Sequence, residues 1–471
     1  MSERTQVYRR LVNPYLPMRV FSDDQVAAIH AAALSIIENQ GMKVLSAAAR
    51  KRLAVDGATA DEAAQTIRLD RGLLAQCLAA APREITLYAG NPQRDVPLSG
   101  RAVAFGPSSG APNVTDLQRG RRAGTIADYE NGVRLCQTYD VVHLLGAFTE
   151  PQDVPPELRQ LAMMRAQLRL SDKIPHTFCR GVAQIGDCFE LVRIANGLSR
   201  EQFRERPCTY TIINTNSPLV LDAPMADGIV EFALAGQVQM ITPFTLAGAM
   251  APVTLAGALT LAHAETLFGL ALAQITRPGA PVVYGSFTSN VDMKSGSPAF
   301  GTPEYVKAQF GAGQMARFLG LPWRSSNATG SNIPDAQGAY ESQMSLWGAL
   351  LGGSNFVLHA AGWLESGLTA SFEKFILDVE QLQMLAEVLL PITPATAGTG
   401  TACGYQPLLA EARSAGIAAG DGGSNATERA SIVYQRALED YQPPARDPAM
   451  LEALEDYVRR RTAAGGSPPQ T

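Results

Sequence analysis

Residues 254–287, TLAGALTLAHAETLFGLALAQITRPGAPVVYGSF, decide the fold of this chain. Their first part, 254–276, is a long apolar pattern typical of a helix, and the run Val282–Gly285 that follows is typical of a buried strand. The helical part is apolar enough to suggest a membrane span, but it contains His263, Glu265 and several threonines. A span would exclude most of these residues, so a buried core helix followed by a buried strand is predicted.

The same alternation begins near residue 101 and occurs eight times. Short strand-like runs occupy Ala102–Phe105, Val142–Ala147, His176–Cys179, Thr209–Ile213, Gln239–Thr242, Val282–Gly285, Trp323–Ser326 and Asn355–His359. Helical patterns follow them over 125–138, 155–170, 183–198, 222–236, 254–276, 303–318, 335–352 and 371–389. Eight such units fit a closed (β/α)8 TIM barrel better than an open sheet, so a barrel over 101–390 is predicted.

Two smaller regions flank the predicted barrel. Residues 1–100 mix short strand and helix patterns, including a helix over 22–40 capped by Ser22, and predict an N-terminal α+β extension. Residues 391–471 begin with Gly- and Thr-rich loop sequence and continue with two helical patterns, which predicts a loop and helical tail. The stretch AGGSPPQT over 464–471 is expected to be frayed.

Composition narrows the class of protein. The chain has 471 residues, 46% hydrophobic and 18% charged, which is typical of a globular protein with a large core. A net charge of −5 argues against nucleic acid as a partner. None of the six cysteines forms a CxxC pair, and the five histidines form no HxH or HExxH motif, so reduced thiols and no bound metal are expected. The polar N-terminal sequence predicts no signal peptide, no membrane association and a cytoplasmic location.

In a barrel, the residues after each strand build the site. These segments contain no GxGxxG or P-loop, no lysine for a Schiff base and no serine-hydrolase elbow. They offer small residues, amides, hydroxyls, aromatics and a few carboxylates. This inventory fits a small substrate held by aromatic and polar groups, with a large partner docked over a wide opening.

Individual candidates each have a structural alternative. His359 is either a hydrogen-bonded core residue or a substrate ligand, because a protonated imidazole can hold an anionic group. Glu365 and Glu150 are either structural carboxylates or partners for a cation. Trp363 is one of several aromatic residues at strand ends that either pack in the core or hold a quaternary ammonium by cation–π attraction.

Several segments resemble the trimethylamine methyltransferase superfamily, specifically its members without pyrrolysine, of which glycine betaine:corrinoid methyltransferases are the characterised type. The resembling segments are LSIIENQGMKVLSAAARKRL (34–53), GPSSGAPNVTDLQRGRRAGTIADY (106–129), PMADGIVEFALAGQ (224–237), MAPVTLAGALTLAHAETLFGLALAQITRPGAPVVYGSF (250–287), TGSNIPDAQGAYES (329–342) and LHAAGWLESGLTASFEKFILDVEQL (358–382). The segments 250–287 and 358–382 are specific to this resemblance.

The resemblance implies a barrel whose mouth faces a separate corrinoid protein, the Co(I) of which attacks a methyl group on a bound amine. No cofactor is then held tightly by this chain. Trimethylamine-type members carry pyrrolysine near the seventh strand, whereas SSNATGSNIPD over 325–335 holds only ordinary residues. A quaternary nitrogen leaves as a neutral amine without a proton, so no acid, base or nucleophile is assigned, and alignment with the cobalt is what the chain must supply.

The resemblance and the strand ends together give a set of expected contacts. Substrate contacts are expected from His359, Glu365, Trp363, Tyr284, Phe287, Glu150, Asn327 and Ser331. The small residues expected to face the corrinoid are Gly330, Ser108, Ser109 and Gly248. Long apolar helices over 254–276 and 371–389, whose outer faces could pair, together with the resemblance, favour a homo-oligomer.

The predicted function is methyl transfer from glycine betaine or a related betaine to a partner's corrinoid. Alternatives are a non-catalytic betaine-binding barrel, a barrel methyltransferase for another methylated amine, and a barrel enzyme with its own phosphate-bearing cofactor, for which the TGS of 329–331 is the one short candidate. Segment 397–430 departs from the family pattern, which leaves carnitine-like and choline-like cations open as substrates.

Overall fold

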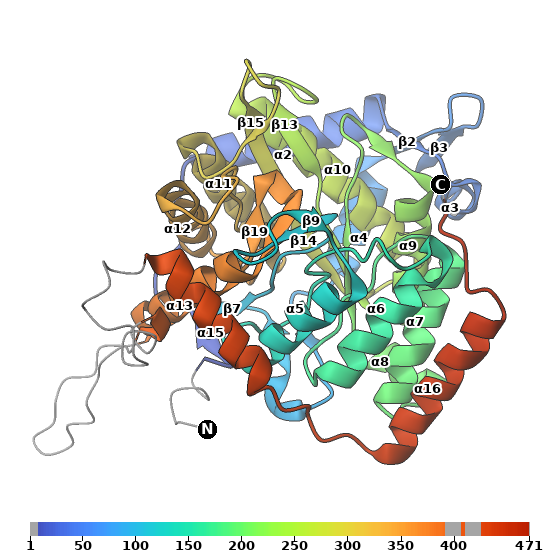
Figure 1. The fold of residues 1–471 in the computed structure, drawn as a ribbon. Coiled ribbons are helices and arrows are strands. Elements are labelled where there is room, and N and C mark those ends of the chain that lie inside the picture. Colours follow the sequence, from blue (N-terminus) through green and yellow to red (C-terminus); the bar gives the residue numbers. More distant parts are fainter. Residues whose placement is uncertain (1–7, 391–406, 410–424, 471) are drawn as a thin grey trace, which may run out of the picture.

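The computed structural model describes residues 8–390, 407–409 and 425–470. A central sheet contains six parallel strands, and helices surround it (Figure 1). These strands are, in spatial order, β7 (Ala102–Phe105), β18 (Phe356–Leu358), β17 (Trp323–Ser326), β14 (Val282–Gly285), β12 (Val238–Ile241) and β10 (Tyr210–Ile213). The short strand β1 (Leu11–Val12) pairs antiparallel with the first half of β7. Six of the eight predicted strands are thus confirmed within about a residue.

The second and third predicted runs form isolated bridges instead of full strands. Leu144 bridges to Ile174, and His176 bridges to Tyr210 of β10. The backbone N–H of His143 donates to the carbonyl of Phe105 in β7 at 2.8 Å. These contacts lie between the two ends of the parallel array. A closed eight-stranded barrel remains a prediction, because two of its members are single bridges.

Each of the eight predicted helices is present. They are α5 (Ile126–Thr138), α6 (Pro156–Leu170), α7 (Val182–Ala195), α9 (Ala223–Ala235), α10 (Leu255–Thr276), α11 (Pro303–Leu319), α12 (Ala336–Leu351) and α13 (Phe372–Leu389), with the short α8 (Arg200–Glu205) added after α7. Most begin at a residue whose side chain accepts a hydrogen bond from the first turn, such as Asp222 before α9 and Thr254 before α10. These caps explain why the helix starts could be read from the sequence.

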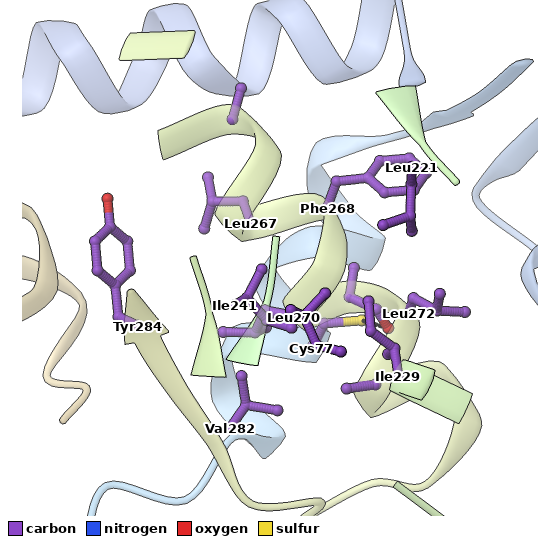
Figure 2. Packing of buried hydrophobic residues seen from close by; sticks show 14 of the residues in the cluster. Cys77, Leu221, Ile229, Ile241, Leu267, Phe268, Leu270, Leu272, Val282 and Tyr284 are labelled. Carbon is purple, nitrogen blue, oxygen red and sulfur yellow. Dashed lines mark hydrogen bonds between the residues drawn. The ribbon is translucent and has the colours of Figure 1, made fainter. Parts of the chain in front are cut away.

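Helix α10 is a core helix, as expected. Figure 2 shows Leu270 of α10 beside Ile241 of β12 and Phe268 of α10 beside Leu221, within one buried cluster that also contains Leu267 and Val282 of β14. By length and composition α10 could cross a membrane, but 78% of its most apolar window is buried inside the protein. The N-terminal region supplies much of this cover.

Two helices from the N-terminal region, α2 (Asp23–Asn39) and α4 (Arg71–Ala80), pack on the outer side of α10. Helix α13 is covered in the same way by α15 (Ala426–Glu439). The expectation that the outer faces of α10 and α13 pair with a second copy is therefore wrong in its premise, because the chain's own helices occupy both faces.

The N-terminal extension is a small sheet with helices, as predicted. Its strands are β2 (Met42–Val44), β4 (Thr66–Leu69) and β3 (Ala58–Asp61), and α3 (Ala47–Leu53) lies beside them. A fourth strand, β11 (Val220–Leu221), comes from the segment after β10 and pairs with β2. A separate hairpin pairs β5 (Ile85–Leu87) with β6 (Val96–Leu98) around the 3-10 turn η1 (Pro92–Arg94). Because β11 joins the two regions, the boundary at residue 100 stays a prediction.

The C-terminal tail contains the two expected helices, α15 and α16 (Pro448–Ala463). The expected fraying of 464–471 is wrong for 464–470, since Ser467 is buried and the backbone N–H of Gln470 donates to the carbonyl of Arg180 at 2.8 Å. Segments 391–406 and 410–424, which include Cys403 and most of the divergent stretch 397–430, lie outside the described residues. The five cysteines within the described residues are free and buried.

Two small sheets that the sequence did not predict follow the carboxyl ends of the central strands. One contains β13 (Phe244–Ala247), β15 (Phe287–Val291) and β16 (Pro298–Ala299). The other contains β19 (Trp363–Leu364), β20 (Thr369–Ser371), β8 (Asn113–Thr115) and β9 (Arg122–Ala123), with the turn η2 (Glu365–Gly367) between β19 and β20. They fix the segments that follow strands β7, β12, β14 and β18.

Candidate functional site

A cavity of about 440 Å³ opens at the carboxyl ends of the central strands. Its walls come from segments after most of these strands, so residues far apart in sequence meet there. The lining residues are Ser109, His176, Phe178, Cys179, Arg180, Ile212, Asn214, Asp222, Pro224, Met225, Phe244, Phe287, Arg324, Leu358, His359, Trp363, Pro469 and Gln470. This is the place where the sequence predicted the site.

Arg324 of β17 is the one fully buried charged residue in the cavity lining, which also contains the partly exposed Arg180 and Asp222. Its side chain is 1% exposed, although burial of a cation ordinarily requires a partner. Within residues 8–390, 407–409 and 425–470, its Nε and Nη1 have no hydrogen-bond partner and no carboxylate pairs with it. Burial lowers the pKa of Arg324 to about 10, which leaves it charged at neutral pH. The site therefore holds an uncompensated positive charge facing a cavity.

Two buried histidines lie near this guanidinium. Burial and the charge of Arg324 lower the pKa of His176 to about 3, and burial, Arg324 and His176 hold the pKa of His359 well below its usual range. Both rings are neutral at pH 7. Both ring nitrogens of His176 and Nδ1 of His359 have no partner among the described residues. The expectation that a protonated His359 holds an anion is thus corrected: it can contribute only as a neutral donor or acceptor.

His359 also has an unusual backbone, with φ of 57°. A residue other than glycine rarely adopts this left-handed conformation unless its surroundings impose it. Here its N–H donates to the carbonyl of Pro107 at 3.2 Å, and its ring lies 3.9 Å from that of Trp363 between centroids. The bend at the end of β18 thereby places both rings at the cavity.

Aromatic rings line another part of the cavity. The ring centroids of Phe287 and Trp363 are 6.3 Å apart and nearly perpendicular, and Phe244 lies 5.3 Å from Phe287. Such faces attract a quaternary ammonium, by about 2 kcal/mol or more where water is excluded. The cavity therefore combines aromatic surface for a cation with a deep positive charge for an anion.

Of the predicted site residues, the structure brings His359, Trp363, Phe287 and Ser109 to the cavity. It does not bring Tyr284 there, because alternate residues of β14 face opposite sides of the sheet. Val283 faces the interior, whereas the Tyr284 hydroxyl lies 2.9 Å from Nδ1 of His263 on α10 (Figure 2 shows the tyrosine beside the core cluster). Tyr284 is therefore not a wall of this cavity.

The predicted carboxylates also lie outside the lining. Glu365 accepts hydrogen bonds from Arg121 at 3.0 Å and from Thr369 at 2.7 Å, so its charge is already paired. Glu150 pairs with Arg159 and Arg180, both at 3.0 Å, and reaches the cavity only through Arg180. Neither is free to hold a substrate cation.

The remaining predicted residues surround the site without lining it. Ser108 is fully buried and its hydroxyl has no partner among the described residues, and the same holds for Oδ1 of Asn327. Ser331 donates its hydroxyl hydrogen bond to the carbonyl of Ile333, and the N–H of Gly330 donates to Glu341. Gly248 has a φ of 88° beside β13. Their contact with a corrinoid stays a prediction.

Three buried carboxylates on surrounding helices hold the segments that follow the strands. Glu265 of α10 accepts from Ser217 at 2.7 Å and from the backbone of Leu219 at 2.8 Å. Glu341 of α12 accepts from the backbone of Gly330 at 2.9 Å, and Asp378 of α13 from that of Gly362 at 2.9 Å. The shape of the opening is therefore fixed by helices and not by the loops alone.

The sequence analysis missed Arg324 and His176. A signal existed, because Arg324 is a charged residue inside the predicted strand WRSS, and residues of one strand alternate between core and helix sides. Trp323 packs outward against the backbone of Gly352, with a ring atom 2.8 Å from the position of an added Cβ there. That placement turns Arg324 inward.

Residues 1–403 and 401–466 match the family described as trimethylamine methyltransferase (MTTB). The chain belongs to the trimethylamine methyltransferase family. It is 34% identical to glycine betaine methyltransferase of Desulfitobacterium hafniense (strain Y51), over 94% of this chain and 97% of that protein. It is 29% identical to trimethylamine methyltransferase MttB of Desulfitobacterium hafniense (strain DSM 10664 / DCB-2), over 78% of this chain and 74% of that protein.

The fold is also similar to that of a solved structure. The crystal structure of the Methanosarcina barkeri monomethylamine methyltransferase (MtmB) superposes with a TM-score of 0.53 at 10% sequence identity, covering 99% of this chain and 92% of that one. At this identity the likeness concerns the fold alone. The family match confirms the resemblance inferred from sequence and supports a methyltransferase of methylated amines.

Proposed function

We propose that this member of the family removes a methyl group from a quaternary amine that also carries a carboxylate, such as glycine betaine, and passes it to the Co(I) corrinoid of a separate protein. The observation that carries the proposal is Arg324, a buried cation without a carboxylate partner in the described chain, at the floor of an aromatic cavity. The similarity to glycine betaine methyltransferase supports the same substrate class.

The two ends of such a substrate need opposite environments. Its carboxylate would accept hydrogen bonds from the planar guanidinium of Arg324, a group that can bind the two oxygens of a carboxylate together. The neutral rings of His176 and His359 would add N–H donors without a second charge. Its ammonium would lie against Phe287 and Trp363. A trimethylamine molecule would leave the Arg324 charge unpaired, so the cavity fits it less well.

The chemistry requires little else from this chain. The carbon–nitrogen bond breaks, the electron pair stays on the nitrogen and a neutral tertiary amine leaves. The partner's corrinoid would supply the nucleophile. The chain's residues hold the substrate at both ends, exclude water and turn one N-methyl group toward the opening. The cavity residue Ser109 fits a polar group approaching from that side.

This chain exposes apolar side chains around the opening, where a partner protein could dock. Large apolar side chains, each more than half exposed, lie on the segments after five of the strands: Leu117, Val253, Met293, Ile333 and Leu368. Apolar residues gathered on loops around a site are typical of a docking surface. We propose that this rim is the contact surface for the corrinoid protein. We further propose that the bridges at Leu144 and His176 complete a closed barrel. The enzyme is proposed to be cytoplasmic.

Three expectations remain predictions. The absence of a bound metal is one, although no group of three or more metal-binding side chains exists in the described part of the chain. The absence of a tightly held cofactor is another. The third is the homo-oligomer. The outer faces of α10 and α13 do not support it, because other helices of the chain cover them.

The test is a methyl-transfer assay with free cob(I)alamin and a substrate panel of glycine betaine, carnitine, choline and trimethylamine, followed by the absorbance change on methylation. We expect turnover of carboxylate-bearing quaternary amines and little of choline or trimethylamine. Turnover of trimethylamine alone would overturn the substrate proposal. Betaine binding without turnover at saturating cob(I)alamin would favour the non-catalytic alternative.

A further inference from the structure

The segment 464–470, which follows the last helix, contributes Pro469 and Gln470 to the cavity wall. Figure 1 shows this segment running from α16 back toward α9. Pro469 and Gln470 line the cavity beside residues from the ends of the third and fourth strand positions, such as Arg180 and Asn214. The segment therefore closes a side of the opening that the barrel loops leave uncovered.

A partly buried hydrogen-bond network fixes the middle of the segment at Ser467. Asp187 of α7 accepts hydrogen bonds from Arg461 at 2.7 Å, Tyr457 at 2.8 Å and the Ser467 hydroxyl at 3.1 Å. The carbonyl of Ser467 also accepts from the Gln184 side chain at 2.6 Å. These bonds join α16 and the segment to α7 at one point.

The end of the segment is held from both sides. The backbone N–H of Gln470 donates to the carbonyl of Arg180 at 2.8 Å, and its side chain donates to Asp227 of α9 at 2.9 Å. Gly181, with a φ of 126°, lies under it, and a Cβ there would come within 3.2 Å of the Gln470 backbone. The absence of a side chain at 181 thus makes room for the segment to pass.

We propose that Pro469 and Gln470, held in place by the rest of segment 464–470, act as a fixed wall of the substrate cavity and set the size of quaternary amine that it accepts. This inference rests on the proposed function for the identity of the substrate, but the wall itself rests on the contacts of Pro469 and Gln470. The wall carries no charge, so it limits the substrate by volume and not by electrostatic attraction. Arg324 and the aromatic rings would then select the chemistry, and this segment the bulk.

The neighbouring prolines give a matched pair of variants. Pro469 lines the cavity, whereas Pro468 is exposed and does not line it. We expect Pro469→Phe to weaken glycine betaine binding at least tenfold by isothermal titration calorimetry, and Pro468→Phe to change it less than twofold. The double variant Pro469→Ala, Gln470→Ala should enlarge the cavity and shift the ratio of affinities severalfold toward bulkier betaines. Equal binding by both phenylalanine variants would overturn the wall.

A second measurement does not depend on the substrate. Trp363 lines the cavity, and in a Trp347→Phe background the one other tryptophan is Trp323, which is buried and does not line the cavity. A change in acrylamide quenching in this background therefore reports a change in access to the cavity. Quenching should rise in the variant Pro469→Ala, Gln470→Ala. This measurement tests the wall even if Pro469→Phe fails to fold. If these changes occur while the wild-type chain binds no betaine, the substrate proposal fails and the wall stands. If betaine binds but neither quenching nor selectivity changes, the wall fails and the substrate proposal stands.

Discussion

At the scale of single residues, the site depends on the buried charge of Arg324, which no carboxylate in the described fold pairs. A buried guanidinium without a partner costs stability, and proteins retain such costs mainly where a ligand offsets them. Arg324 meets this description, because it lines the cavity and its Nε and Nη1 have no partner among the described residues, while the neighbouring histidines stay neutral. The residue-level predictions therefore concern the two ends of the substrate separately.

The carboxylate end is tested by Arg324→Met, which keeps much of the side-chain volume and removes the charge. We expect the dissociation constant of glycine betaine to rise by about 10- to 100-fold, equivalent to roughly 1.4–2.8 kcal/mol, while any choline binding is retained. Isothermal titration with both ligands measures this. Equal losses for glycine betaine and choline would contradict a carboxylate contact.

The ammonium end is tested by Trp363→Ala. Loss of one desolvated cation–π contact should raise the dissociation constant of betaines by about tenfold. Trp347→Ala is the matched control, because Trp347 lies in α12 and does not line the cavity. The assignment would be refuted by similar affinities for both tryptophan variants.

At the scale of elements, the sequence predicted the helices and strands well and their side-chain directions poorly. Helix starts are marked by local capping residues, and apolar periodicity marks buried elements, so both can be read along the chain. Side chains of a strand alternate between the two faces of the sheet, so the directions of Tyr284 and Arg324 depend on their exact positions in four-residue strands. A shift of one residue in the predicted strand would turn each side chain to the opposite face. The cavity contacts of Pro469 and Gln470 depend on tertiary packing that no local pattern records.

Also at this scale, the helices that grip the loops should matter for stability. Glu341→Ala would leave the backbone N–H of Gly330 without its acceptor and would remove one of the two acceptors of the Ser331 N–H, at a cost of about 1–3 kcal/mol. We expect a lower melting temperature and slower methyl transfer. Glu304→Ala, at an exposed position in the first turn of α11, is the control and should change neither appreciably. A melting temperature for Glu341→Ala equal to that of the control would count against this role.

At the scale of the whole molecule, every one of the five histidines has a lowered pKa. Burial is the first cause in each case, and it lowers the pKa of His143, His176 and His263 to about 3. The folded chain thus keeps these rings neutral, while the unfolded chain binds protons below the ordinary value of 6.5. The unfolded state then holds more protons, so the free energy of unfolding decreases as the pH falls from about 7 toward 5.

Denaturant unfolding at pH 7.5, 6.0 and 5.0 measures this loss. Each histidine that protonates only on unfolding contributes about 1.4 kcal/mol per pH unit below 6. His263→Gln should reduce the slope by close to one such proton, since His263 is fully buried. A slope that is unchanged by this substitution, or stability that is constant from pH 7.5 to 5.0, would disprove the account.

The cover over α10 has a consequence for how the chain is made. Helices α2 and α4 end at Asn39 and Ala80, whereas α10 begins at Leu255, so both covering helices leave the ribosome long before the apolar helix does. A helix that passes for a membrane span by length and composition thus meets its partners as soon as it emerges. If the first hundred residues followed the barrel in the gene instead of preceding it, the newly made α10 would stay open to chaperones, aggregation and the membrane insertion machinery until synthesis was complete.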